Sequence, residues 1–123
     1  MRGACALRPG IPGISENIRV RSIVGRFLEH HRVYFFANDG HPDLFCSSAD
    51  WLERNLLRRI ETGFPVLEPE LAERVREEAL INYLADNVNA WSLHEDGRYE
   101  RVQPVGDEMP HSAQGWLLAK ICT

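Results

Sequence analysis

Two short polar clusters lie in the first half of the chain, on either side of an apolar stretch. The first is His30-His31-Arg32, and the second is Ser47-Ser48-Ala49-Asp50, which Arg54 and Asn55 follow. Histidine changes its charge near neutral pH and can exchange a proton with a phosphate oxygen. Arginine binds phosphate oxygens through its planar fork, and hydroxyl and backbone N–H groups at a strand exit can cradle an anion. The combination predicts a histidine-centred site for phosphate groups between residues 22 and 55.

Within this site, His30 is the predicted assisting acid or base and also a predicted phosphate contact. Arg32, Ser47, Ser48 and Arg54 are weaker candidates for phosphate contacts. Each residue also has a simpler interpretation. A lone histidine is more often a surface or core residue, a Ser-Ser pair is usually part of a turn, and Asp50 could be only a helix cap. The prediction therefore rests on the combination.

The elements that must position these residues are predicted from local patterns. Residues 22–30 have helical spacing, with Gly25 as a weak point, so His30 would lie at a helix C-terminus that favours a protonated imidazole. If the next strand already includes His30, its side chain and that of Arg32 share one face. Residues 32–37 are β-branched and aromatic on both faces, which predicts a central strand. Asn38-Asp39-Gly40 predicts a turn, and residues 43–47 predict the return strand.

The rest of the chain continues this mixture of helices and strands. Residues 1–7 resemble the end of a strand, and a turn-rich loop follows at residues 8–13. Trp51, Trp91 and Trp116 are expected in or near the core. The fold class is therefore predicted to be α/β, with a mixed sheet flanked by helices in a single domain. The other expected elements are a helical turn at 53–58, a strand at 60–66, a helix from Pro69 to about Asn87, a hairpin with strands at 89–94 and 99–103, and a closing helix at 111–122.

Composition narrows the function classes. The net charge of −4 argues against a nucleic-acid partner, and no apolar run reaches the ~20 residues of a membrane-spanning helix. The three cysteines are scattered without a CxxC pair, which fits the reducing cytoplasm and argues against a zinc or redox motif. Lys120 is the only lysine, so every other basic side chain is an arginine.

Several ordered motifs resemble the C-terminal domain of polyphosphate kinase, and together they cover nearly the whole chain. They are Arg2-Gly3-Ala4-Cys5, Leu7-Arg8-Pro9-Gly10, Ser15-Glu16-Asn17-Ile18, the stretch from Ser22 to His30, Ser47-Ser48-Ala49-Asp50-Trp51 with Arg54-Asn55, Phe64-Pro65-Val66, Leu84-Ala85-Asp86-Asn87 and Ser112-Ala113-Gln114. The resemblance implies a phospholipase D-like fold. His30-x-Arg32 parallels the His-x-Lys of phospholipase D relatives, whereas Ser47-Ser48-Ala49-Asp50 departs from their Gly-Ser-x-Asn.

The resemblance also implies an activity. Family members reversibly transfer the terminal phosphate of ATP to inorganic polyphosphate through a phosphohistidine held in another domain. By the same resemblance His30 is the second, assisting histidine and Arg2 contacts ATP. Mg²⁺ would accompany the nucleotide, and no metal ligands are identified in this chain. The expected partners are ATP or ADP, polyphosphate, the remaining domains of the enzyme and, in a homo-oligomer, further copies. The expected location is the cytoplasm, with membrane association through the full enzyme as an option.

Because family members are several times longer and the first strand is cut at Met1, we expect a fragment that is inactive alone. Two alternatives stay open. The first is a non-catalytic fragment that binds polyphosphate or nucleotide. The second is a phospholipase D-type hydrolase that pairs two copies of His30 across a dimer.

Overall fold

The computed structural model describes residues 5–122, which divide into two compact units. Residues 5–27 and 82–122 form unit 1, and Leu28–Ile81 form unit 2. Of the strand predicted at residues 1–7, the first four residues lie outside the described part, and residues 5–8 form no strand. The turn-rich loop that follows is confirmed. No helix of the described residues is long and apolar enough to cross a membrane.

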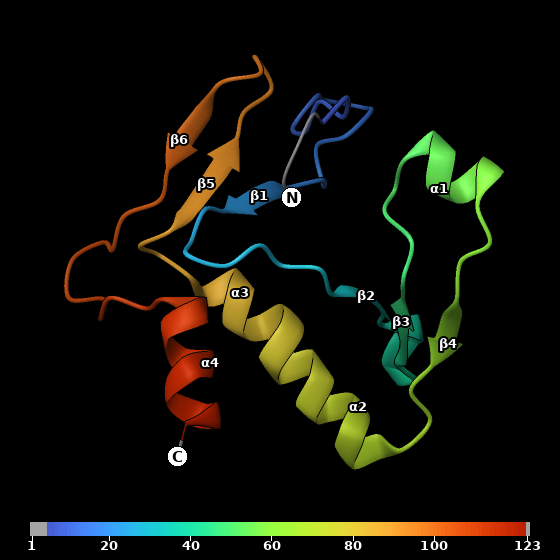
Figure 1. Cartoon of the computed structure of the whole chain (residues 1–123). Helices are drawn as coiled ribbons and strands as arrows, with labels where there is room; N and C mark the ends of the chain where they lie inside the picture. The colour runs from blue at the N-terminus through green and yellow to red at the C-terminus, as the bar shows by residue number, and fades with distance from the viewer. Residues whose placement is uncertain (1–4, 123) are drawn as a thin grey trace. The chain divides into compact units, whose positions relative to one another are not determined.

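Unit 1 contains a three-stranded antiparallel sheet with the order β1-β5-β6 (Figure 1). The strands are β1 (Val20–Ile23), β5 (Ala90–Leu93) and β6 (Tyr99–Arg101). The predicted hairpin is confirmed: β5 and β6 are antiparallel, and Gly97 has a φ of 85° in the turn between them, which suits glycine. Two helices complete the unit, α3 (Asn82–Ala85) and α4 (Ala113–Ile121), so the predicted closing helix is confirmed.

The helix predicted at residues 22–30 is wrong. Ser22 and Ile23 belong to β1, which pairs with β5, and Val24 continues the pairing by donating its N–H to the Asn89 carbonyl at 3.0 Å. Gly25 is a close-approach glycine: a Cβ there would collide with the side-chain amide of Gln114. The Oε1 of Gln114 accepts a hydrogen bond from the Phe27 N–H at 3.0 Å, and its Nε2 donates one to the Phe27 carbonyl at 2.8 Å. Long-range pairing with β5 and α4 therefore overrides the local helical spacing.

A buried carboxylate joins three segments of unit 1. Asp86 is fully buried and follows α3 directly. Its Oδ1 accepts hydrogen bonds from the backbone N–H groups of Val88 and Asn89 at 3.1 and 2.6 Å, and its Oδ2 accepts one from Ala113 at 2.9 Å. Arg21 of β1 donates to the Asp86 carbonyl at 2.9 Å. The residue thus ties the end of α3, the approach to β5 and the start of α4 together.

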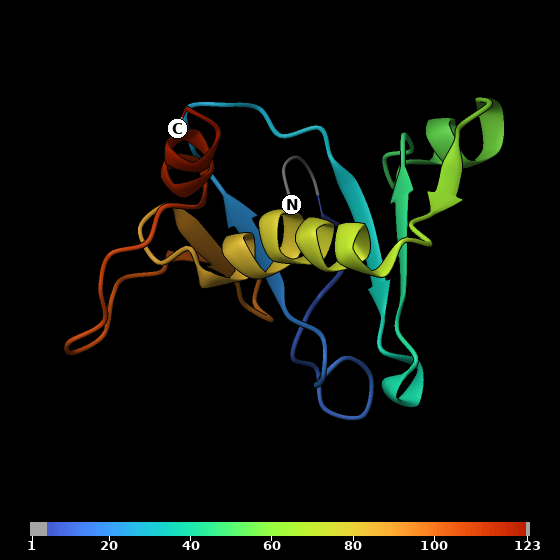
Figure 2. The same ribbon diagram turned by 90° about the horizontal axis from the view of Figure 1, so that it is seen from below.

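Unit 2 contains a second three-stranded antiparallel sheet, with the order β2-β3-β4. Figure 2 shows β2 and β3 running side by side. The strands are β2 (Arg32–Phe36), β3 (Asp43–Ser47) and β4 (Gly63–Pro65), and the helical segments are η1 (Asn38–Gly40), α1 (Glu53–Arg58), α2 (Pro69–Arg76) and η2 (Glu77–Ile81).

The hairpin of unit 2 confirms its sequence signals, with one correction. Asn38 and Asp39 both have positive φ, of 43° and 50°, which these residue types tolerate in a tight turn. The central strand is β3, however, and β2 lies at an edge, contrary to the prediction. The apolar residues of β2 suggested a buried central strand, but two of them, Phe35 and Phe36, are exposed in the structure. Trp51, expected in or near the core, is also exposed, at 76%.

The predicted α/β class is confirmed, but the single mixed sheet is replaced by two antiparallel ones. Short turns join β2 to β3 and β5 to β6, and such turns produce antiparallel pairs. The helix predicted from Pro69 to about Asn87 is present as consecutive segments α2, η2 and α3. The strand predicted at 60–66 is shorter, at Gly63–Pro65. The contacts divide the predicted single domain into two compact units.

Replacing Asp86 should strongly destabilise the chain. Asp86→Ala leaves three backbone N–H groups without their acceptor, and each unsatisfied buried group costs about 1–3 kcal/mol. We expect the free energy of unfolding, measured by urea denaturation, to fall by roughly 3 kcal/mol or more. Asp96→Ala, in the exposed β5–β6 turn, is the matched control and should cost much less. Equal losses in the two variants would contradict this role of Asp86.

Candidate functional site

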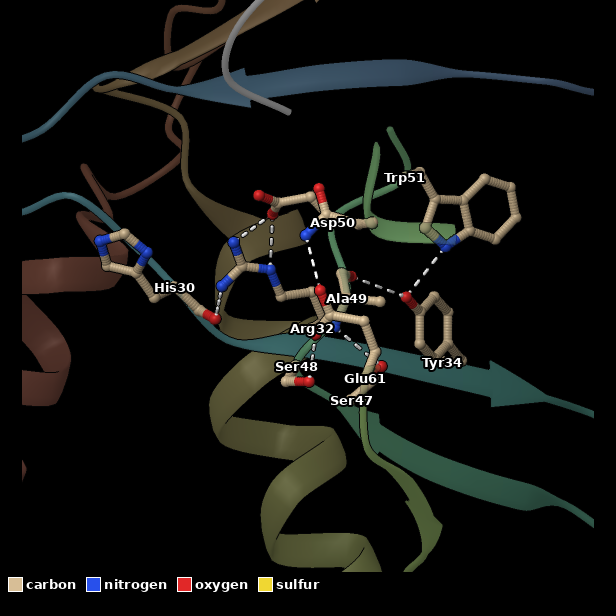
Figure 3. Close-up of polar contacts among 10 residues, drawn as sticks. His30, Arg32, Tyr34, Ser47, Ser48, Ala49, Asp50, Trp51 and Glu61 are labelled. Atoms are coloured by element: carbon tan, nitrogen blue, oxygen red, sulfur yellow. Dashed lines mark hydrogen bonds and ion pairs between the residues drawn. The ribbon is translucent and has the colours of Figure 1, made fainter. Parts of the chain in front are cut away.

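His30 lies directly before β2, and its side chain is exposed. Its imidazole makes no hydrogen bond with any described residue, and in Figure 3 the ring points away from the guanidinium of Arg32. No helix precedes it, so the predicted effect of a helix C-terminus on its charge is wrong. The strand starts at Arg32, so the two residues do not share a strand face.

Arg32 connects His30 to the loop after β3 (Figure 3). Its Nε donates to Asp50 Oδ1 at 2.8 Å, and its Nη2 donates to the same oxygen. Its Nη1 donates to the carbonyl oxygen of His30. One guanidinium therefore joins the backbone before β2 to a carboxylate after β3. Hydrogen bonds of this charge-assisted kind are stronger and more directional than neutral ones.

Asp50 is the residue around which the predicted phosphate contacts gather. The hydrogen bond from Arg32 lowers the pKa of Asp50 below its ordinary 3.8, and the nearby charges of Arg32, Arg54 and His30 act in the same direction. Asp50 is not the cap of α1, because Leu52 holds that position. Sequence analysis gave Asp50 no firm role, yet its carboxylate binds Arg32, one of the predicted residues.

The two serines are held by their own loop. Ser47 Oγ accepts the N–H of Ala49 at 3.0 Å, while the N–H of Ser48 pairs with the Thr62 carbonyl at 2.9 Å. Ser48 Oγ accepts the N–H of Thr62 at 3.0 Å. The N–H groups of Ser48 and Ala49 are thus already paired, although the anion cradle was predicted to use free ones. Contact between the serine hydroxyls and phosphate stays a prediction.

Glu61 fixes this loop and was missed by the sequence analysis. Its Oε2 accepts a hydrogen bond from Ser48 Oγ at 2.5 Å, and its Oε1 accepts one from Nδ2 of the buried Asn55 at 2.7 Å. These hydrogen bonds lower the pKa of Glu61 below its ordinary 4.5. No local sequence pattern pairs a glutamate with a serine thirteen residues before it. Glu61 thus connects the end of β3 with α1.

An aromatic pair borders the same loop. Trp51 donates a hydrogen bond from Nε1 to the Tyr34 hydroxyl at 2.9 Å, and the centroids of the two rings lie 6.0 Å apart. The Tyr34 hydroxyl also approaches the Ala49 carbonyl at 3.5 Å. These contacts connect the loop to the middle of β2, on the side away from His30 (Figure 3).

The outcome for the predicted site residues is mixed. Arg32 is bonded to Asp50 and to the backbone of His30, and the charges of Arg54 and His30 help to lower the pKa of Asp50. Arg2, the expected ATP contact, lies outside the described residues. Within residues 5–122, no cluster of three or more His, Cys, Asp or Glu side chains could hold a metal ion. Asp50 and Glu61 of unit 2 accept hydrogen bonds from protein groups.

Acid should lower the folding stability of unit 2, because it protonates the carboxylates of Asp50 and Glu61. A carboxyl group whose pKa is lower in the folded than in the unfolded state stabilises the fold above its unfolded pKa. That contribution is lost as the pH falls through the folded value, so stability should decline below the ordinary values of 4.5 for Glu61 and 3.8 for Asp50. Acid unfolding followed by circular dichroism should therefore show a weaker pH dependence in Glu61→Gln. Glu53→Gln, which alters an exposed carboxylate 3.5 Å from Arg58, is the control. An unchanged profile in Glu61→Gln would refute the assignment.

Comparison with known proteins identifies the family. Residues 1–114 match the family model described as polyphosphate kinase C-terminal domain 2. The polyphosphate kinase of Xylella fastidiosa strain Temecula1 is 64% identical over 121 residues, and that of Pseudomonas aeruginosa strain PAO1 is 55% identical over 121 residues. In both comparisons the match covers 98% of this chain and 17% of the relative.

A solved structure agrees with these sequence matches. The crystal structure of polyphosphate kinase from Porphyromonas gingivalis superposes with a TM-score of 0.89 at 38% identity, over 98% of this chain and 18% of that one. This likeness is consistent with the phospholipase D-like fold that the motifs implied. The chain spans about a sixth of the length of its relatives, and it belongs to the polyphosphate kinase family, whose C-terminal domain 2 it matches.

Proposed function

We propose that this chain supplies an assisting histidine and part of the phosphate-binding surface of a polyphosphate kinase. In the complete enzyme it would contribute to reversible transfer of the terminal phosphate of ATP to inorganic polyphosphate. The observation that carries the proposal is the exposed imidazole of His30, which has no hydrogen-bond partner among the described residues and whose backbone is bonded to the Arg32–Asp50 pair, in a chain of this family.

The chemistry assigned to each residue follows from its surroundings. The His30 imidazole can give a proton to a phosphate oxygen or take one away, because no described side chain occupies its nitrogens. Arg54 is exposed on α1 and has a charge that can stabilise the phosphoryl group as negative charge spreads over its oxygens. In this proposal the phosphohistidine forms in another domain, and Arg2 adds a further contact to ATP.

The proposal separates this chain's part from that of the whole enzyme. Because the chain spans 17% of its relatives, transfer requires the domains that the remaining length supplies. Mg²⁺, when bound with the nucleotide, would neutralise phosphate charge, and no residue here is assigned to hold it. ATP or ADP and polyphosphate are accordingly the proposed ligands, and the other enzyme domains are the proposed partners.

Loss of His30 should impair catalysis more than binding. We suggest a chimera in which this chain replaces the matching 121 residues of the Xylella fastidiosa enzyme. His30→Ala should lower kcat for polyphosphate synthesis by roughly 10²–10⁴-fold, the usual contribution of a general acid or base. His41→Ala, an exposed histidine before β3, is the control and should retain full activity. A chimera that keeps full kcat without His30 would exclude the assisting role.

Binding by the chain alone separates the proposal, and its non-catalytic binding alternative, from an inert domain. Titration of the 123-residue chain with polyphosphate should show an affinity that falls steeply as salt is added, because exposed charge pairs are screened. Arg54→Ala should weaken it, whereas Arg98→Ala, on the β5–β6 turn of unit 1, should not. Incubation with labelled ATP should leave no label on histidine. Labelled histidine would show that the nucleophile lies within this chain, and absence of any binding would argue against a phosphate-handling surface.

A further inference from the structure

The contacts of Arg32 define a role that differs from phosphate binding. All three of its donor nitrogens, Nε, Nη1 and Nη2, are directed at protein acceptors. Two donate to Asp50, and the third donates to the backbone of His30. The guanidinium has five N–H donors in a fixed plane, so these bonds fix its orientation and direct most of its donors away from any ligand.

We propose that Arg32, held by Asp50, is a positioning residue that fixes the backbone of His30 and thereby the place of its imidazole. The inference rests on the proposed function of His30 and deepens it. Arg32 acts through His30 and contacts no phosphate, which separates it from Arg54.

The arrangement explains why a backbone contact matters at this position. His30 lies in an extended segment before β2, and strand pairing with β3 begins only at Arg32. The Nη1 bond to the His30 carbonyl therefore restrains a residue that the sheet does not hold. Asp50 in turn prevents the guanidinium from turning toward an approaching phosphate. A reacting group displaced by about 1 Å can lose roughly 100-fold in rate.

Kinetics of the same chimera distinguish positioning from phosphate binding. Arg32→Ala should lower kcat by about 100-fold, with the KM values for ATP and polyphosphate changed by roughly twofold at most. Asp50→Asn should lower kcat as well, because it releases the arginine. If Arg32 were a phosphate ligand, Asp50→Asn would instead lower the KM for polyphosphate, since it frees the guanidinium and removes a negative charge. The two hypotheses thus predict opposite changes in kcat/KM for polyphosphate from the single substitution Asp50→Asn.

Three further variants sharpen the kinetic test. The double variant Arg32→Ala with Asp50→Asn should be no slower than Arg32→Ala alone, because both changes break one unit. Arg32→Lys should also stay slow, because an ammonium group has no planar fork to join two acceptors, although it keeps the positive charge. Arg98→Ala, which removes an arginine 3.8 Å from Asp96, is the matched control and should leave kcat unchanged.

A spectroscopic measurement on the chain itself keeps the proposal testable if a variant chimera is unstable. The amide of His31 belongs to the same peptide group as the His30 carbonyl, so its ¹⁵N and ¹H resonances report the Nη1 contact. Both should shift in Asp50→Asn, which leaves the sequence around His31 unchanged, but not in Arg98→Ala. Unshifted resonances, a normal kcat in Arg32→Ala, or a lowered KM in Asp50→Asn would each overturn the proposal.

The failure of the positioning role can be told apart from the failure of the proposed function. If His30→Ala keeps full activity, the proposed function fails. If His30→Ala loses activity while the Arg32 and Asp50 variants stay normal, only the positioning role fails.

Discussion

Polar side chains fix the backbone of irregular segments in both units. Backbone N–H and C=O groups outside helices and strands lose their water partners when they are enclosed, and an unpaired group is costly. Asp86 accepts hydrogen bonds from three N–H groups that are partly or fully enclosed, whereas Arg32 donates to the exposed carbonyl of His30 and so fixes its position. Few apolar side chains of the described residues are buried. The largest fully buried side chain in this part of the chain is a polar one, that of Asp86. Polar ties of this kind therefore determine how the irregular segments are placed.

This constraint divides the motifs that resemble polyphosphate kinase into two groups. Asp86 and Gln114 hold unit 1 together through hydrogen bonds with backbone groups. Gly25 belongs with them, because the Gln114 amide occupies the space that a side chain would need. In unit 2, His30 and Asp50 are connected through Arg32, which joins the first polar cluster to the second. A motif residue is thus not automatically a ligand.

Sequence reasoning succeeded where a structure depends on neighbouring residues. The Asn38-Asp39-Gly40 turn, with both strands that it joins, the Gly97 turn and the helix from Pro69 were all predicted from local chemistry. It failed where distant segments decide. The helix expected at residues 22–30 is replaced by pairing with β5, and the partners of Asp50 and Glu61 lie eighteen and thirteen residues away. Spacing along the chain predicted candidate site residues, but it did not predict which of them bind one another.

Asp50 poses an electrostatic question, because a carboxylate beside a phosphate site opposes the binding of anions. Its charge is balanced locally by Arg32, whose hydrogen bond is the main cause of its lowered pKa. The carboxylate therefore stays ionised at neutral pH and retains the arginine, and the pair together presents little net charge to a ligand. Arg54 on α1 also acts on Asp50, and among the described residues its side chain has no hydrogen-bond or ion-pair partner. In the proposed phosphate site, a negative residue thus fixes one cation in a structural role and leaves another to meet the phosphate.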